Sequence, residues 1–193
     1  MNRLTILIDM DDVLEDLVGC WISELNKKHG TTVTIEDVTD WKIAKFFPTL
    51  TNEELYAPLF DPDMWLKLEV MPNAPENVKR LIDDGHIVRI VTATHYGTVL
   101  PKMKRFLEMY PFLTWEDVII ASDKSVINGD VMIDDGVHNL ESASCIKLLF
   151  DRPHNRAYNA RANNMIRVKT WEEIYTEISR IAKMKSALSH LGR

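Results

Sequence analysis

Four groups of polar residues stand at or just after the ends of four short apolar runs in this sequence. In chain order they are Asp9-Met10-Asp11-Asp12, Thr92-Ala93-Thr94, Lys124 and Asp134-Asp135. If the four runs are strands of one open parallel sheet, their carboxyl ends meet at a single edge, which is where ligands bind in such sheets. We therefore expect one site built from all four groups.

The residue types at this edge suit the transfer of a phosphoryl group. Such a transfer needs a nucleophile, a hard cation to screen the phosphate dianion, and donors for the equatorial oxygens. Aspartate is an established covalent acceptor of phosphate. Because several carboxylates would repel one another without a cation, and oxygen ligands favour Mg²⁺ over softer metals, we expect Mg²⁺ here. The hydroxyl of Thr92 and the ammonium of Lys124 would bind phosphoryl oxygens, and we expect Ala93, which follows Thr92, in the same phosphate-binding group.

Asp9 and Asp11 lie two residues apart where the first run ends, so both carboxylates can face one pocket once the backbone turns. We expect Asp9 to attack phosphorus while a protonated Asp11 donates to the leaving oxygen. Asp11 would then take a proton from the water that hydrolyses the aspartyl-phosphate. Closely spaced carboxylates favour a shared proton, which is the state that this role requires.

Short apolar runs predict the strands that position these groups. They cover residues 4–8, 87–91, 118–121, 131–133 and 146–150. Helical stretches separate most of them, as in a parallel sheet buried on both faces. The pattern predicts a doubly wound, mostly parallel, Rossmann-like α/β fold.

Capping residues and apolar periodicity mark the helices. An apolar stripe at helical spacing runs from Leu14 to Leu25 and ends at Gly30. A second helix opens at Ala74, after the N-cap signature of Asn73 and Glu76, and stops at Gly85. A third follows the capping box of Thr170 and Glu173, with Trp171 in its first turn.

One connection is far too long for the fold. About sixty residues separate the first strand from the helix at Ala74, where ~2–6 are usual. This stretch contains the Leu14 helix, a capping box at Thr51 and Glu54, and three of the five tryptophans. We predict that residues 14–72 form a small helical cap inserted into a core of residues 1–13 and 73–193.

The motif order D-x-D, Thr, Lys, Asp-Asp resembles that of the haloacid dehalogenase superfamily over nearly all of the chain. More narrowly, the stretches IDMDDVLED, LEVMPNAPENVKRL, ASDKSVINGDVMIDD and LLFDRPHN resemble the 5′(3′)-deoxyribonucleotidase family, the cytosolic type C 5′-nucleotidases. The resemblance implies a Rossmann-like core with a cap after the first motif. It also implies Mg²⁺ held by Asp9, the Asp11 carbonyl and the pair Asp134-Asp135.

Three positions depart from that family. Asp12 stands where such proteins usually have Gly, Ala93 where the vertebrate enzymes have Ser, and Gly136 where they have Arg. None of the three is a motif residue itself (Asp9, Asp11, Thr92, Lys124, Asp134 or Asp135), so the departures bear on which nucleotide is bound. For Asp12 we expect a place in the first turn of a helix, favoured by the helix dipole, and no catalytic role.

Aromatic residues of the cap are the candidates for holding a nucleobase. They are Trp41, Phe46, Phe47 and Trp65. By resemblance, deoxyribonucleotidases hold the base in the cap, and the Leu14 to Leu25 stripe already gives the cap a core. The alternative is that Trp41 and Trp65 simply pack the cap. We expect Trp21, Trp115 and Trp171 to be packing residues, and His95 and His138 to be surface residues near the site.

The expected function is Mg²⁺-dependent hydrolysis of a phosphate monoester, with a deoxyribonucleoside or ribonucleoside monophosphate as substrate. A phosphatase of another small metabolite is the alternative within this class. A phospho-accepting receiver shares the residue types, but carries its Lys on the last strand and lacks so long an insertion. A binding module without catalysis is disfavoured by the complete set of catalytic groups.

Composition limits the partners and the compartment. The 193 residues, 46% hydrophobic and 27% charged, suit one soluble α/β domain with an insertion. A net charge of −6 argues against a nucleic-acid polymer as partner, and no apolar run is long enough for a membrane span. Cys20 and Cys145 lack metal or redox spacing, so we expect reduced thiols in the cytoplasm. A homodimer is possible on the sequence alone.

Overall fold

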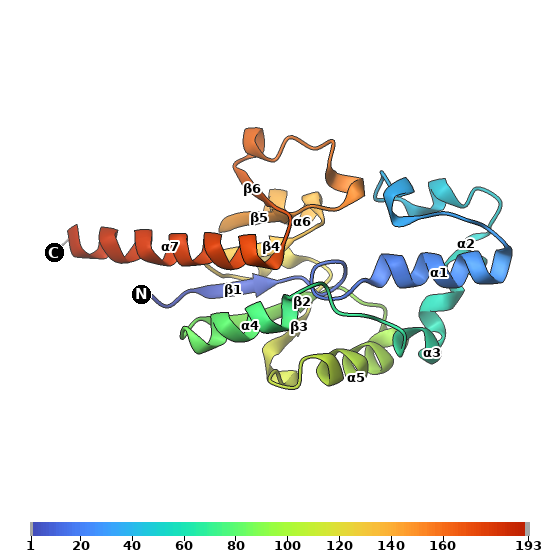
Figure 1. The fold of residues 1–193 in the computed structure, drawn as a ribbon, viewed down its shortest axis with the longest axis horizontal. Helices are drawn as coiled ribbons and strands as arrows, with labels where there is room; N and C mark the ends of the chain where they lie inside the picture. The colour runs from blue at the N-terminus through green and yellow to red at the C-terminus, as the bar shows by residue number, and fades with distance from the viewer. Residues whose placement is uncertain (1, 192–193) are drawn as a thin grey trace.

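A six-stranded parallel sheet forms the centre of the protein (Figure 1). The computed structural model describes residues 2–191. The strands are β1 (Thr5–Ile8), β2 (Ile87–Thr92), β3 (Val118–Ile120), β4 (Val131–Asp134), β5 (Ile146–Phe150) and β6 (Met165–Val168), in the spatial order β3-β2-β1-β4-β5-β6. The chain runs outward from β1 to β3 and then returns to β4 on the other side of β1. This is the predicted doubly wound fold, with β6 as a strand that the sequence analysis missed.

The pairing register aligns the ends of the three central strands. Ile8 of β1 pairs with Ile90 of β2 and with Ile133 of β4. Asp9 and Asp134 each follow one of these paired residues, so they come out at the same edge. Because the direction of winding reverses between β1 and β4, this edge also has the crevice that parallel sheets use for ligands.

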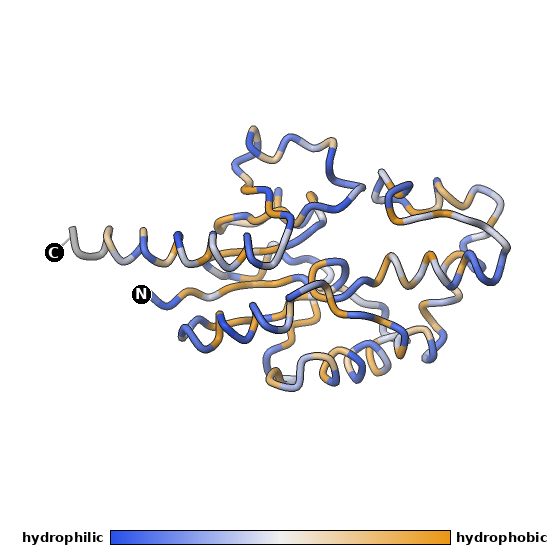
Figure 2. The backbone as a smooth tube through the Cα atoms, viewed as in Figure 1, coloured by the Kyte–Doolittle hydropathy of each residue, from blue (hydrophilic) through white to orange (hydrophobic). Residues whose placement is uncertain are grey.

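Helices cover both faces of the sheet, as the alternation along β1 requires. Ile6 and Ile8 point into a large core with α4 (Ala74–Asp83), α5 (Val99–Met109) and α7 (Trp171–Leu191). Leu7 points the other way, into a smaller core with α6 (Val137–Ser142). The central strands are mainly apolar in Figure 2, as expected for strands buried on both faces.

Two of the expectations for tryptophan are confirmed and one is wrong. Trp171 is fully buried and its indole N–H donates to the Val13 carbonyl at 2.9 Å, and Trp21 is buried in the cap. Trp115 is 54% exposed, because it lies in the short turn Trp115–Asp117 that leads into the outer strand β3. A turn before an edge strand offers no second layer for the ring to pack against.

The long connection after β1 forms a helical cap at the tips of the strands, at the right-hand end in Figure 1. Its helices are α1 (Leu17–His29), α2 (Asn52–Tyr56) and α3 (Pro62–Trp65), with short 3₁₀ turns between them. The cap has a core of its own, in which Trp21, Leu25 and Leu55 are buried. The capping box of Thr51 and Glu54 is present as predicted.

The first cap helix begins at Leu17 and not at Leu14 as the sequence predicted. Leu14 is buried in the core of the sheet domain, and its carbonyl accepts from the Met71 N–H at 2.8 Å. The Asp16 N–H donates to the Glu69 carbonyl at 3.0 Å. We still propose residues 14–72 as the inserted cap, with these two backbone bonds joining its entering and leaving segments.

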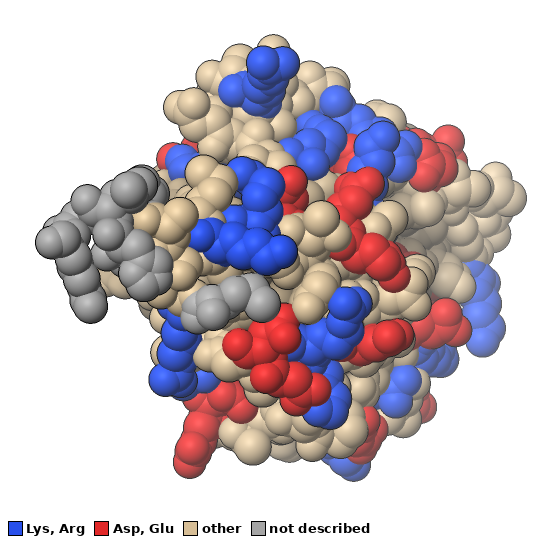
Figure 3. Space-filling view, turned by 60° about the vertical axis from the view of Figure 1, so that its left-hand side comes forward, with Lys and Arg blue, Asp and Glu red and all other residues tan. Residues whose placement is uncertain are grey.

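The surface carries charges of both signs. On the face shown in Figure 3, Lys and Arg side chains lie among Asp and Glu side chains. One ion pair among the surface residues joins Arg89 to Asp117 at 2.9 Å. Within residues 2–191, no helix has the length and apolar character needed to cross a bilayer.

Candidate active site

The edge where β1, β2 and β4 end brings together a lysine and two carboxylates. Lys124 lies in a short turn after β3, and its buried ammonium is 2.5 Å from Asp9 Oδ1 and 2.7 Å from Asp134 Oδ2. Burial of an ammonium is tolerated only with paired charge, and here two carboxylates supply it. The grouping that the sequence predicted is therefore present in space.

Three buried carboxylates at this edge can share one cation. Ligand atoms of Asp9, Asp134 and Asp135 all lie within 4.8 Å of one another. Burial raises the pKa of Asp9 to about 7, although the Lys124 ammonium acts in the opposite direction. Burial, together with the charges of Asp12 and Asp9, raises the pKa of Asp135 well above its usual range. Carboxylates crowded in this way fit an oxygen-binding divalent cation, which would remove the cost of keeping them ionised.

The two neighbouring aspartates at the end of β4 differ in what already binds them. Asp134 Oδ1 accepts from the Gly136 N–H at 2.7 Å and from Asn139 Nδ2 at 3.1 Å, and its Oδ2 is bound by Lys124. Asp135 borders the open cavity, and its Oδ2 lies 3.3 Å from His154 Nε2. Asp135 is thus the more available of the pair for a new ligand.

Asp11 is held by a lysine that the sequence analysis missed. Lys102 of α5 is 1% exposed, and its Nζ lies 2.6 Å from Asp11 Oδ2, 2.9 Å from Thr92 Oγ1 and 3.4 Å from the Ala93 carbonyl. Its position gives the signal that could have found it. Met103 and Phe106, its neighbours on the buried side of the helix, are core residues, and a lysine on such a face needs a partner.

The predicted phosphate-binding residues are only partly at the cavity. Ala93 and Lys124 line it, whereas Thr92 is fully buried and its hydroxyl accepts from Lys102. Ser122 lines the cavity and was not predicted. Its position two residues before Lys124, in a loop at the strand ends, is the signal that could have indicated it.

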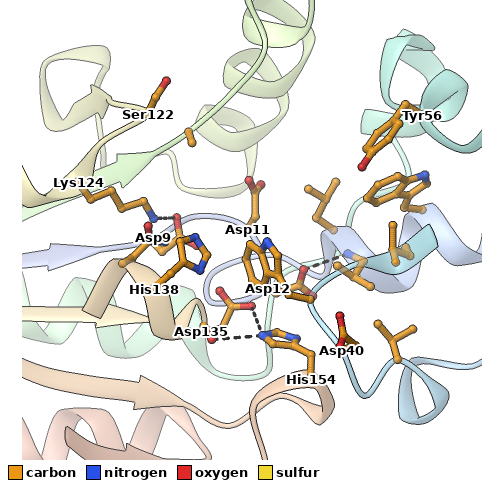
Figure 4. Close-up of a pocket in the computed structure, with 18 residues that line it drawn as sticks. Asp9, Asp11, Asp12, Asp40, Tyr56, Ser122, Lys124, Asp135, His138 and His154 are labelled. Carbon is orange, nitrogen blue, oxygen red and sulfur yellow. Dashed lines mark hydrogen bonds and ion pairs between the residues drawn. The ribbon is translucent and has the colours of Figure 1, made fainter. Parts of the chain in front are cut away.

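A cavity of about 330 Å³ runs from these charged groups to the cap (Figure 4). At its inner end lie Asp9, Asp11, Lys124 and Asp135. Cap side chains line the outer end: Leu17, Val18, Trp21, Val38, Asp40, Trp41, Ile43 and Tyr56. The cavity is therefore polar and charged at one end and mainly apolar at the other.

Of the four aromatic residues proposed for the pocket, only Trp41 lines this cavity. Phe47 is 2% exposed and, with Phe46 against it, packs in the cap core, so the prediction for these two was wrong. They were needed as core because one helical stripe cannot enclose the cap by itself. Trp65 is buried, donates its N–H to the Leu59 carbonyl at 2.9 Å, and borders a second cavity that Asp11 also lines.

His138 and His95 are not buried, as expected, yet each lines a cavity. His138 contributes to the wall of the cavity over Asp9, and its ring centroid lies 4.7 Å from that of Trp41. His95 borders the second cavity, beside Phe60. Their positions after β4 and β2 follow from the same strand register that places the carboxylates.

The departures from the family pattern have structural explanations at two positions. Asp12 has a left-handed φ of 58°, a conformation that favours Gly. The expected place in the first turn of a helix is wrong, because Asp12 lies in the turn before α1. Its carboxylate nevertheless accepts from the Val18 N–H of α1 at 3.2 Å and pairs with Arg152 at 2.7 Å. At Gly136, a Cβ would lie 2.9 Å from Asp134 Oδ1, so a larger residue there would displace the loop.

Comparisons with known proteins identify the family. The family model described as 5′ nucleotidase, deoxy (Pyrimidine), cytosolic type C protein matches residues 2–185. The chain is 38% identical over 173 residues to the 5′(3′)-deoxyribonucleotidase of Bacillus subtilis (strain 168), with 89% of this chain and 96% of that protein covered. It is 30% identical over 173 residues to the 5′(3′)-deoxyribonucleotidase of Clostridium acetobutylicum, with 90% and 93% covered.

Solved structures share the fold at low sequence identity. A HAD family hydrolase from Deinococcus radiodurans R1, with bound phosphate and sodium, has a TM-score of 0.64 at 13% identity and covers 91% of this chain and 95% of its own. A putative HAD hydrolase from Bacillus subtilis, bound to magnesium, has a TM-score of 0.56 at 14% identity, with 91% and 98% covered. Because the family model matches residues 2–185 and the fold is shared with HAD hydrolases, the chain belongs to the cytosolic type C 5′-nucleotidase family.

Proposed function

We propose that this chain is a Mg²⁺-dependent phosphatase that hydrolyses nucleoside monophosphates, preferentially deoxyribonucleotides, through a phosphoryl group carried on Asp9. The observation that carries the proposal is the polarity of the cavity, which is charged around Asp9 and apolar at the cap. A nucleoside monophosphate has the same polarity, with a dianion at one end and a planar base at the other. The deoxyribonucleotidase names of the relatives support this substrate class.

Asp9 is the nucleophile in this proposal. Lys124 binds its Oδ1, which leaves Oδ2 to form a bond to phosphorus while the bond from phosphorus to the leaving oxygen breaks. Asp11 gives its proton to that oxygen, and the nucleoside leaves as an alcohol. Water then attacks the phosphorus of the aspartyl-phosphate, Asp11 takes the water proton, and inorganic phosphate leaves with Asp9 regenerated.

The cation site is the carboxylate trio around Asp9. We assign the side chains of Asp9 and Asp135 and the carbonyl of Asp11 as ligands, and Asp134 as the residue that fixes Lys124, because its oxygens already accept hydrogen bonds. When bound there, Mg²⁺ supplies positive charge that screens the incoming dianion. Lys124 contributes a fixed positive charge from the protein itself.

The remaining phosphoryl oxygens would be bound by groups that line the cavity beside Asp9. These are the Lys124 ammonium and the backbone of Ala93. The buried Thr92 would act indirectly, because its hydroxyl accepts a hydrogen bond from Lys102.

The nucleoside would lie against the cap. Trp41 and Tyr56 offer aromatic faces to a base, and Ile43 offers an apolar contact. Stacking of a base on an aromatic side chain contributes roughly 1–3 kcal/mol in single-strand binders. Beside Trp41, we therefore assign Tyr56 and Ile43 to the base, in place of the predicted Phe46 and Phe47.

The proposal extends to the compartment and the oligomeric state of the protein. Cys20 and Cys145 are free thiols, which supports the cytoplasm as the compartment. A homodimer stays a prediction that sedimentation of the purified protein would test.

Phosphate release over a panel of substrates tests the proposed function. The panel contains deoxyribonucleoside and ribonucleoside monophosphates, sugar phosphates and p-nitrophenyl phosphate, each with Mg²⁺. Deoxyribonucleotides should have the highest kcat/KM. Higher values for a sugar phosphate would transfer the assignment to another metabolite, and no release from any ester would remove it.

A further inference from the structure

Lys102 is a buried cation to which the reaction described above gives no role. Its side chain is almost wholly enclosed, on the inner face of α5. Lysine is rarely buried to this degree without a paired charge, because its ammonium loses its hydration. Of the residues that the structure describes, the other buried lysine is Lys124, which lies on the nucleophile. Both buried lysines therefore belong to the same sheet edge.

The contacts of Lys102 exclude it as a phosphate ligand in this arrangement. An ammonium has three N–H donors, and three acceptors lie around it: Asp11 Oδ2, Thr92 Oγ1 and the Ala93 carbonyl. Two of these belong to the end of β2 and one to the loop after β1. Lys102 therefore ties the Asp11 carboxylate to the neighbouring strand.

Lys102 is the group that holds the Asp11 carboxylate among the residues that the structure describes. Asp11 Oδ1 is buried and has no hydrogen-bond partner there. Glu15, whose two carboxylate oxygens are also buried without a partner, is joined to Asp11 by a β-bridge. Burial and the charge of Asp11 raise the pKa of Glu15 well above its usual range, so the Lys102 ammonium is the charged partner of the Asp11 carboxylate on this side.

We propose that Lys102 is a positioning residue for the proton transfers of Asp11. Because Oδ1 is buried while the side chain as a whole is 26% exposed, Oδ2 is the oxygen that exchanges the proton with the leaving group and then with water. By donating to one lone pair of Oδ2, Lys102 fixes the carboxyl group with the other lone pair free for that exchange. The inference rests on the proposed function only for the role of Asp11. It adds a residue from α5 to catalytic groups that otherwise come from the ends of strands and the loops after them.

The test uses K102M, which keeps most of the aliphatic stem and removes the charge, and K102R, which keeps the charge. K104M is the matched control, because Lys104 lies on the same helix but is exposed. Two substrates separate the two chemical steps. A deoxyribonucleotide has an alcohol leaving group that needs a proton, whereas p-nitrophenolate leaves without one.

For K102M, we expect the pre-steady-state burst of p-nitrophenolate to keep its rate within about threefold, because that step needs no acid from Asp11. Single-turnover cleavage of the deoxyribonucleotide should fall by ~10²-fold, within the range of lost general acid–base catalysis. Steady-state kcat on p-nitrophenyl phosphate should also fall, since hydrolysis of the phosphoenzyme needs Asp11 as base. K102R should recover part of each loss, and K104M should match the wild type.

Equal losses on both substrates, with a raised KM, would contradict the proposal and make Lys102 a phosphate ligand. Unchanged kinetics in K102M would show that the ion pair is only structural. If K102M does not fold, K102R tests the proposal instead. Its displaced guanidinium should lower cleavage of the deoxyribonucleotide more than the burst with p-nitrophenyl phosphate, by a smaller factor than expected for K102M. If the wild type gives a burst with p-nitrophenyl phosphate but does not hydrolyse deoxyribonucleotides, the proposed substrate is wrong. The comparison of burst rate with steady-state kcat on p-nitrophenyl phosphate still tests the role of Lys102 in that case.

Discussion

The indole of Trp41 lies with its ring centroid 4.7 Å from the imidazole of His138, at an angle of 69° between the ring planes. Trp41 comes from the cap, and His138 comes from α6 beside the end of β4. Trp41 nevertheless remains 56% exposed, so the indole keeps a surface that a base could cover. The contact places the outer wall of the cavity directly over the catalytic edge.

Replacing Trp41 with Ala should change substrate preference more than stability. We expect kcat/KM for a deoxyribonucleotide to fall by ~10-fold or more, because a stacking contact is lost. Hydrolysis of p-nitrophenyl phosphate, which has no base, should fall much less. Phe47→Ala is the control from the same cap: its ring is buried in the cap core and is not part of the cavity wall, so it should lower Tm without changing this preference. Equal losses on both substrates for Trp41→Ala would make Trp41 a packing residue.

Metal dependence should be complete. EDTA should abolish turnover, because the crowded carboxylates of Asp9, Asp134 and Asp135 cannot accept a phosphate dianion without a cation. Mg²⁺ should restore activity better than Ca²⁺, whose longer and looser coordination would misplace the reacting groups. Turnover at the full rate in chelator would contradict the assigned site.

Stability of the metal-free protein should fall as pH rises. The pKa of Asp9 is raised by burial to about 7 in the folded protein, whereas it is ~3.9 in an unfolded chain. Between these values the folded state binds more protons than the unfolded state, so the free energy of unfolding decreases with pH in that window. Tm measured in EDTA from pH 4 to pH 8 should show this decline, and Mg²⁺ should raise Tm more at pH 8 than at pH 5.

Asp9→Asn provides the control for that titration, because it removes the carboxyl group and keeps the shape. Its Tm should depend less steeply on pH than the Tm of the wild type. The same slope in both proteins would show that Asp9 does not titrate in this window.

Substitutions at Asp12 should show the cost of its left-handed backbone conformation in the free energy of unfolding. Asp12→Ala and Asp12→Gly both remove the ion pair with Arg152 and the cap on α1. Only Ala must still take a side chain into the left-handed region, which costs roughly 1 kcal/mol relative to Gly. Urea unfolding should therefore find Asp12→Gly more stable than Asp12→Ala by about that amount, and the reverse order would contradict the backbone explanation.

The sequence predicted the residues whose positions follow from local patterns. Asp9, Asp134 and Lys124 could be placed because each comes at or just after the end of an apolar strand, and parallel strands bring such ends together. Strand β6 was missed because its residues, Met165–Val168, include an Arg and are only partly buried. Its identity as a strand depends on pairing with β5, which no local pattern records.

Tertiary packing decided the remaining assignments. Lys102 and Tyr56 reach the site from helices whose rotation about their axes the sequence does not give. Phe47 and Trp41 have similar chemistry and lie six residues apart, yet one is buried in the cap and the other lines the cavity. Thr92 ends its strand as predicted, but its hydroxyl is covered by Lys102, a contact between two separate elements.

The central claim is that Asp9 carries the phosphoryl group, and trapping that group tests it most directly. Asp11→Asn should slow hydrolysis of the intermediate, because it removes the base for the second step. After mixing this variant with p-nitrophenyl phosphate and quenching in acid, peptide mass spectrometry should locate one phosphoryl group on Asp9. A phosphoryl group on Asp134 or Asp135 instead, or a burst of product with no phosphorylated peptide, would contradict the account.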